Sequence, residues 1–282
     1  MPTYELPRDI GIHGVFSTRK TSQAMTASKD YPPLPAQPPF ATLAKLTDMA
    51  IISWDSQGTM TLPHLGMEVA EECIFRTTGR MVSDFEAEPI ITTINASRKF
   101  GIERAKAGAK FIVHDTGSTK DTRIVGYWTK TIDDDPKQGN DASTKLYRNV
   151  LKTHAMDLEF WQNLAAHYNI CNIWLFHSDI KGQDAPSNDA KAKAATDLQR
   201  KAKGLLGAEL AARITGKSWN YYYENIRAFY YQTVEQSFGK QQAMWTTRSD
   251  EVAVKPGFPE NVLPSKMPAD FRLLFKYARG EK

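Results

Sequence analysis

The stretch NIWLFHSDIKGQDAPS, Asn172 to Ser187, places chemically active side chains where a short apolar strand passes into a polar loop. A loop between a strand and a helix often holds a phosphate, because backbone N–H groups and the helix N-terminus face the anion. His177 ends the apolar run, and an imidazole with an ordinary pKa of about 6.5 suits general base catalysis. The stretch therefore predicts a phosphate-binding loop with a candidate base beside it.

This loop departs from the usual composition of a phosphate-binding loop. It contains a single glycine, Gly182, where several glycines normally let the backbone approach the anion. Asp184 repels a pyrophosphate, and Pro186 supplies no N–H. Lys181 adds a positive charge. The sequence leaves open whether the loop still binds phosphate.

Two other groups of side chains invite a metal interpretation. His154 and Asp157 share a face of one expected helix at i, i+3, but no H-E-x-x-H pattern accompanies them. Asp133, Asp134 and Asp135 with Asp141 lack the spacing of a calcium-binding EF-hand loop. A solvated acidic loop is the simpler interpretation of the aspartates, so we expect no metal cofactor.

Composition limits the class of protein. The 282 residues are 41% hydrophobic and 24% charged, which is enough apolar material for a core. The net charge of +4 comes without a dense Lys/Arg block, so we expect no nucleic-acid partner. Cys73 and Cys171 form no disulfide framework, and we find neither a signal peptide nor an apolar run of about 18 residues. We therefore expect a soluble cytoplasmic protein without a membrane partner.

The chain divides into a proline-rich N-terminal arm, residues 1–40, and a single domain, residues 41–282. Apolar spacing predicts helices over 41–56, 66–78 and 89–107. Two β-branched and aromatic runs, 110–115 and 123–131, flank a Gly-Ser turn and predict an antiparallel hairpin.

The second half of the domain continues with alternating elements. We expect helices over 144–167 and 188–203, strands over 169–176 and within 226–238, and a final strand over 271–279; residues 206–213 suit either type. This order predicts an α/β or α+β fold with a central mixed sheet.

Several segments resemble the GNAT superfamily of acyl-CoA N-acyltransferases. ATLAKLTDMAIISWDS resembles the family's opening helix, SRKFGIERAKAGAKFIVHDTGSTKDTRIVGYWTK resembles its helix and hairpin, and HSDIKGQDAPS occupies the place of its CoA loop. The resemblance covers about Ala41 to Arg279. It implies a mixed, mostly antiparallel central sheet flanked by helices, and transfer of an acyl group from acetyl-CoA or another acyl-CoA to a primary amine.

The resemblance also assigns roles to residues. His177 would be the general base, with Asp179, Glu209 and His114 as alternatives, and Tyr222, within Tyr221–Tyr223, would protonate the leaving thiolate. A backbone N–H in Leu175–His177 would polarise the thioester. Lys191 and Lys193 are candidates for the 3′-phosphate of CoA. The implied cofactor-binding residues are Leu175, Phe176, Lys181, Gly182, Gln183, Asp184, Ala185 and Ser187.

Three hypotheses follow from these observations. The first is an N-acetyltransferase acting on a small-molecule amine or a protein amine. The second is a GNAT-fold protein that has lost catalysis and binds a ligand or partner, which the glycine-poor loop favours. The third is an unrelated α/β protein. The sequence leaves the acceptor, the acyl-chain preference and the oligomeric state open.

Overall fold

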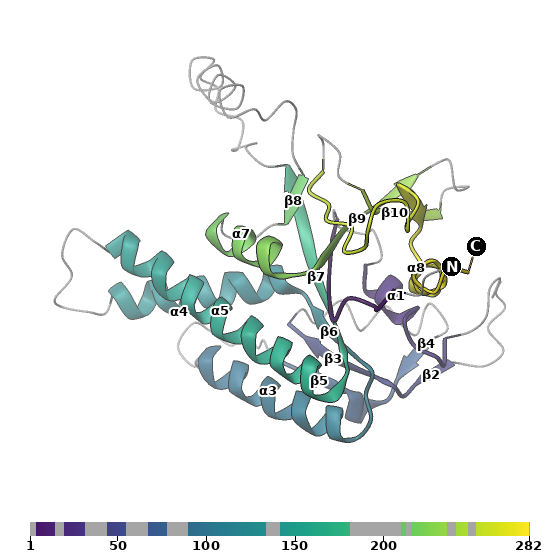
Figure 1. The fold of residues 1–282 in the computed structure, drawn as a ribbon. Coiled ribbons are helices and arrows are strands. Elements are labelled where there is room, and N and C mark those ends of the chain that lie inside the picture. The colour runs from purple at the N-terminus through teal and green to yellow at the C-terminus, as the bar shows by residue number, and fades with distance from the viewer. Residues whose placement is uncertain are drawn as a thin grey trace, which may run out of the picture.

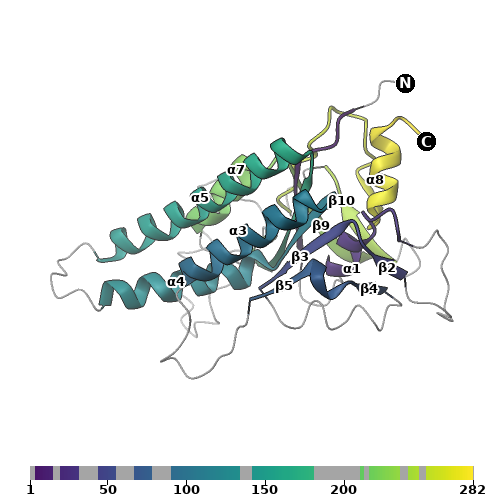
Figure 2. The same cartoon turned by 90° about the horizontal axis from the view of Figure 1, so that it is seen from below.

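The computed structural model describes residues 4–14, 20–31, 44–54, 67–77, 90–133, 142–180, 210–212, 216–235, 241–247 and 252–281. In these segments a central sheet is covered by helices on both faces, as Figures 1 and 2 show. The fold is therefore mixed α/β, as the sequence predicted. Strand β1 lies inside the sheet, so Asp9–Gly14 belongs to the core, although we expected it in an N-terminal arm.

The main sheet has nine strands, eight of them in the order β11-β10-β9-β1-β7-β6-β3-β5, while β8 pairs with β7 off this path. From β9 to β5 every neighbouring pair is parallel, so the prediction of a mostly antiparallel sheet is wrong. Strands β2 and β4 form a separate parallel pair. The strands are β1 Asp9–Gly14, β2 Ala44–Leu46, β3 Met49–Ser53, β4 Met67–Val69, β5 Ile74–Arg76, β6 Phe111–Asp115, β7 Cys171–Ile180, β8 Leu210–Ala212, β9 Ala228–Glu235, β10 Gln241–Trp245 and β11 Lys266–Pro268.

Helices divide unequally between the two faces of the sheet. Helices α3, α4, α5 and α7 cover one face, and α1 and α8 cover the other (Figure 2). No helix of the described segments combines the length and the apolar character needed to cross a bilayer. The bounds are α1 Lys20–Met25, the 3₁₀ turn η2 Glu71–Cys73, α3 Ile90–Lys106, α4 Gly117–Asp133, α5 Ala142–Tyr168, α7 Gly216–Asn225 and α8 Phe271–Ala278.

Each central strand contributes to two cores, because successive side chains point to opposite faces. In β7, Ile173 and Leu175 join the core under α1 and α8, whereas Trp174 and Phe176 join the core under α3, α4, α5 and α7. A strand buried on both faces reads as a continuous apolar run rather than an alternating one. Every residue of β3, MAIIS, is buried in this way.

The helices predicted over 41–56 and 66–78 are wrong. The first range contains β2 and β3, and the second contains β4, η2 and β5. Met49–Ile52 match a helical spacing by chance, because a run in which every position is apolar satisfies any period. Burial between two helical layers decides in favour of a strand.

The strands predicted over 123–131 and 271–279 are also wrong, since both segments are helical. In α4 the buried Lys120 and Asp121 lie four and three residues before the buried Ile124. In α8, Phe271, Leu274 and Ala278 are buried at i, i+3 and i+7, and Asp270 caps the first turn by accepting from the Arg272 N–H. Helical periodicity outweighs the β propensity of the β-branched and aromatic residues in these segments.

Five described elements match the predictions to within a few residues. Helices α3 and α5 and strands β6, β7 and β9 confirm the helices over 89–107 and 144–167 and the strands over 110–115, 169–176 and 226–238. The helix predicted over 188–203 lies outside the described residues.

Candidate functional site

The carboxyl ends of β1, β7, β6 and β3 meet at one edge of the sheet, because these strands run parallel. Strand order reverses beside β1, with β7, β6 and β3 on one side and β9 on the other. Open α/β sheets bind their ligands outside the carboxyl ends of the strands at such a reversal. A ligand site is therefore expected at the carboxyl edge of the sheet next to Gly14, the last residue of β1.

The ammonium group of Lys20 is a buried positive charge at this edge. Its Nζ donates a hydrogen bond to the carbonyl oxygen of Gly14 at 2.9 Å, and the side chain is only 5% exposed. Burial lowers the pKa of Lys20 to about 8, while the nearby Asp115 carboxylate opposes this shift. A lysine in this environment gains from any anionic ligand that replaces the carbonyl oxygen as its partner.

Thr21 and Asp115 meet at the same edge although 94 positions separate them. The Thr21 hydroxyl donates to Asp115 Oδ2 at 3.0 Å, and Asp115, the last residue of β6, is 2% exposed. The neighbouring strand supports this geometry, because Ser53 pairs with Asp115 and the Trp54 N–H donates to the Asp115 carbonyl oxygen at 2.5 Å. A hydroxyl, a carboxylate and an ammonium thus lie together at the carboxyl edge.

These groups suit a phosphate with an accompanying hard cation. Lys20 supplies positive charge, and the oxygens of Thr21 and Asp115 are the ligand type that Mg²⁺ prefers. Among the described residues there is no cluster of three or more His, Cys, Asp or Glu side chains that would form a complete metal cage. Mg²⁺ does not need such a cage, since it is usually bound through one or two carboxylates, waters and substrate phosphates.

Lys20, Thr21 and Asp115 were not among the candidate site residues expected from the sequence. A signal was nevertheless present in GVFSTRKT, Gly14 to Thr21. It matches the phosphate-binding pattern G-x-x-x-x-G-K-[ST] except at Arg19, which stands where the second glycine belongs. The pattern requires a preceding strand and a following helix, and β1 and α1 supply both.

The residues predicted for CoA binding divide into two groups. Leu175 and Phe176 are fully buried in β7 and point to opposite faces, so their side chains belong to the two cores. The rest of the predicted loop, Lys181, Gly182, Gln183, Asp184, Ala185 and Ser187, lies outside the described residues, as do Lys191, Lys193 and Glu209.

The two predicted catalytic residues lie on opposite faces of the sheet. His177 follows Leu175 at the next-but-one position of β7, so the alternation of the strand directs it toward the α1 face. Tyr222 of α7 is fully buried in the other core, where its ring contacts Trp174 and Phe176. The structure therefore does not bring the expected base and acid together.

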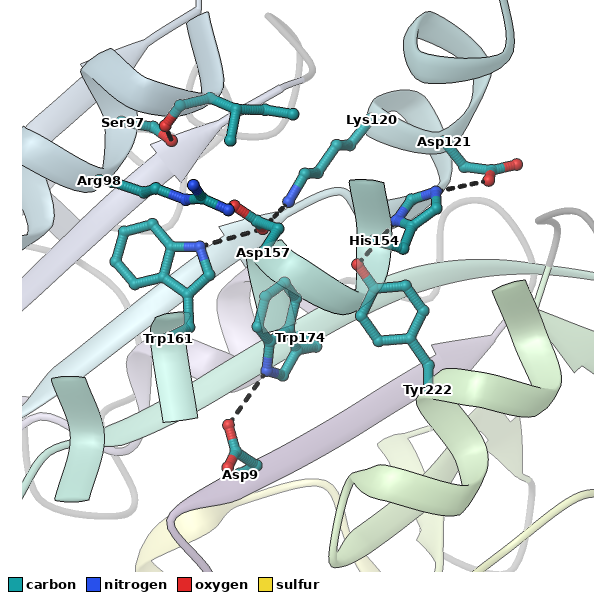
Figure 3. A network of polar contacts seen from close by, with 11 residues as sticks. Asp9, Ser97, Arg98, Lys120, Asp121, His154, Asp157, Trp161, Trp174 and Tyr222 are labelled. Carbon is teal, nitrogen blue, oxygen red and sulfur yellow. Dashed lines mark hydrogen bonds and ion pairs between the residues drawn. The ribbon is translucent and has the colours of Figure 1, made fainter. Parts of the chain in front are cut away.

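Tyr222 belongs to a buried chain of polar groups (Figure 3). His154 donates from Nε2 to Asp121 Oδ1 at 2.8 Å, and its Nδ1 accepts from the Tyr222 hydroxyl at 3.0 Å. Burial raises the pKa of Tyr222 well above its ordinary value, so the phenol stays protonated as the donor of this bond. The hydroxyl thus connects α7 to α5.

Replacing Tyr222 by Phe should reduce the free energy of unfolding by about 1–3 kcal/mol, because His154 Nδ1 loses its donor inside the core. Urea denaturation measures this loss. Tyr221→Phe is the matched control, since the neighbouring ring is only half-buried and should change stability by less than about 0.5 kcal/mol. Equal effects of the two substitutions would contradict a structural role for the Tyr222 hydroxyl.

A buried ion network lies next to this chain (Figure 3). The Lys120 ammonium of α4 donates to Asp157 Oδ2, the Arg98 Nε of α3 donates to Asp157 Oδ1 at 3.1 Å, and Trp161 Nε1 donates to Asp157 Oδ2 at 3.1 Å. Burial acts to raise the pKa of Asp157, but Lys120 and Arg98 outweigh it, so the pKa falls below its usual value. The network joins three helices through one carboxylate.

His114, an alternative base in the sequence analysis, is a core residue. Its ring stacks on Trp174 with centroids 3.7 Å apart and is 1% exposed. Burial lowers its pKa to about 3, with a further contribution from the nearby Lys120 cation. A ring held in this position packs the core and does not face a ligand at the carboxyl edge.

Comparison with known proteins assigns this chain to no family. The chain matches no known protein-family model, and no curated protein sequence is significantly similar to it.

Proposed function

We propose that this protein binds a nucleoside triphosphate with Mg²⁺ at the carboxyl edge of its sheet and hydrolyses the terminal phosphate. The observation that carries the proposal is the hydrogen bond between Thr21 and Asp115 beside the buried Lys20. In P-loop nucleotide-binding proteins a lysine contacts the β- and γ-phosphates, and the adjacent Ser or Thr and an aspartate at a strand end hold Mg²⁺. Lys20, Thr21 and Asp115 are the residues proposed for these three roles.

The surrounding elements support this assignment. Asp115 ends β6, an apolar strand buried in the sheet, and β1 ends at Gly14, the first residue of the GVFSTRKT segment. In the proposed complex, phosphate oxygens replace the Gly14 carbonyl oxygen as the partner of the Lys20 ammonium. Hydroxyl and carboxylate oxygens fit Mg²⁺, which would neutralise part of the phosphate charge when bound.

Arg19 is the departure from the usual pattern. Glycine at that position normally lets the backbone come close to the phosphates, and Val15–Arg19 lies outside the described residues. The substitution places an arginine next to Lys20 in the sequence, and a guanidinium binds phosphate oxygens well.

Acyl transfer from acyl-CoA remains a prediction that the fold does not favour. Its expected hairpin is absent, because residues 123–131 belong to α4, and most of its expected CoA loop lies outside the described residues. Nucleotide binding instead uses residues that the structure brings into contact.

Substituting Lys20 by Ala should weaken nucleotide binding at least about tenfold, because a hydrogen bond to a charged group contributes roughly 1.5–3 kcal/mol. Titration of a fluorescent ATP analogue in the presence of Mg²⁺ measures this change. Asp115→Asn should weaken binding in Mg²⁺ but much less in EDTA, because the carboxylate is proposed to act through the cation. Lys106→Ala is the matched control, since Lys106 is exposed in the last turn of α3 and leads to the amino end of β6.

Two outcomes would contradict the proposal. One is a wild-type protein that binds no nucleotide with Mg²⁺, and the other is equal affinity in the wild type and Lys20→Ala. Acetyl-CoA should be titrated in parallel. Stabilisation by acetyl-CoA but not by ATP would favour the acyl-CoA hypothesis instead.

A further inference from the structure

His177 lies beside Gly14 at the same edge of the sheet. In the pairing of β1 with β7, His177 lies opposite Gly14, the residue whose carbonyl oxygen accepts from Lys20. Strand β7 also pairs with β6, which ends in Asp115. His177, three residues before the end of β7, therefore lies on the strand that separates the lysine side of the proposed site from its carboxylate side.

The side chain of His177 lies on the same face of the sheet as the proposed phosphate-binding groups. Side chains two residues apart in a strand point to the same face. Asp115 lies two residues after Val113, and His177 lies two residues after Leu175. Val113 and Leu175 both belong to the core on the α1 face, so Asp115 and His177 are directed to that face. His177 as a residue is half-buried and both of its ring nitrogens are enclosed, whereas His13 and His114 are buried entirely.

A hydrogen bond holds the backbone at this position. The His177 N–H donates to Ser118 Oγ at 3.0 Å, and Ser118 lies in the first turn of α4, three residues after Asp115. The bond ties β7 at His177 to the segment that follows the proposed cation ligand, Asp115. His177 is thus held between the Gly14 end of β1 and the first turn of α4.

We propose that His177 is the general base for hydrolysis of the bound nucleoside triphosphate, an inference that rests on the function proposed above. A water oxygen attacks the γ-phosphorus, and the bond from the γ-phosphorus to the β–γ bridging oxygen breaks. The nucleoside diphosphate leaves with the electron pair of that bond. The imidazole takes the proton from the water and releases it to solvent. The products are nucleoside diphosphate, inorganic phosphate and a proton.

Kinetics of His177→Ala with Mg-ATP test this role. We expect kcat to fall about 100-fold, the lower end of the range for a general base. Affinity for a fluorescent ADP analogue should stay within about threefold, because the base acts in the transition state rather than in ground-state binding. Added imidazole should restore part of the rate in His177→Ala, which a purely structural role would not produce. His167→Ala, at an exposed position in the last turn of α5, should leave hydrolysis unchanged.

The outcomes separate this inference from the proposed function. Nucleotide binding and hydrolysis with an unaffected His177→Ala would overturn the role of His177 and leave the site intact. Binding without hydrolysis above background in the wild type would also overturn it, whereas no binding at all would remove both proposals. If thermal melting shows that His177→Ala is unfolded, His177→Asn keeps a polar side chain at the position and tests the same change in kcat.

Discussion

Replacing Asp157 by Leu should cost about 3–5 kcal/mol of the free energy of unfolding, because it leaves a buried charge without its partner. The Asp157 side chain is fully buried and accepts from Lys120, Arg98 and Trp161. Lys120 is only 1% exposed, so its ammonium is enclosed with Asp157 in the protein. Urea denaturation at neutral pH gives the loss directly.

The double variant Asp157→Leu with Lys120→Met should recover a large part of this stability. Apolar side chains of similar volume often replace a buried ion pair at little cost, whereas removing one partner is strongly destabilising. Glu159→Ala is the control on the same helix, since Glu159 is exposed and should change stability by less than about 0.5 kcal/mol. A loss below about 1 kcal/mol in Asp157→Leu would show that Lys120 finds another environment.

Acidification should destabilise the protein steeply between pH 6.5 and pH 4, through two buried histidines. His13 donates from Nε2 to the Ala253 carbonyl oxygen and accepts at Nδ1 from the Ser178 hydroxyl, both at 2.7 Å. Burial lowers the pKa of His13 to about 4 and the pKa of His114 to about 3, from an ordinary value of 6.5. In this pH range the unfolded chain binds protons that the folded chain does not, so stability falls as pH falls.

Protonation of each histidine should lower the free energy of unfolding by roughly 2–3 kcal/mol between pH 7 and pH 4.5. Each pH unit below the ordinary pKa of 6.5 and above the folded-state pKa costs about 1.4 kcal/mol of stability. His114→Phe keeps an aromatic ring against Trp174 and removes the titrating group, so its loss on acidification should be smaller than that of the wild type by this amount. His167→Phe changes an exposed histidine and should leave the pH dependence unchanged. Identical acid losses in His114→Phe and the wild type would rule out the contribution of His114.

Periodic burial made several elements predictable from the sequence. Helix α3 buries Ile90, Ile94, Gly101 and Ala105 at helical spacing, so the pattern and the structure agree. Strands β6 and β7 are short β-branched and aromatic runs bounded by polar residues, and they too lie where the sequence predicted. In each case the signal is local, because the pattern of apolar residues within the element itself shows which of its faces is buried.

The chemistry at the carboxyl edge was only partly visible in the sequence. His177 was identified by its residue type at the end of an apolar run, and GVFSTRKT carried a lysine-threonine signal weakened by Arg19. No local pattern in the sequence distinguished Asp115 from the other aspartates. Its contact with Thr21 depends on strands β1 and β6, which are not neighbours in the sheet and are far apart in the chain.

The sequence by itself determined the α/β class and the helices and strands whose burial follows a clear period. Only the tertiary structure decided the direction and order of the strands, the helical state of α4, and the placement of His177 and Tyr222 on opposite faces of the sheet. The physical reason is that a parallel strand covered on both faces loses its alternation, and strand pairing depends on long-range contacts that no local pattern encodes.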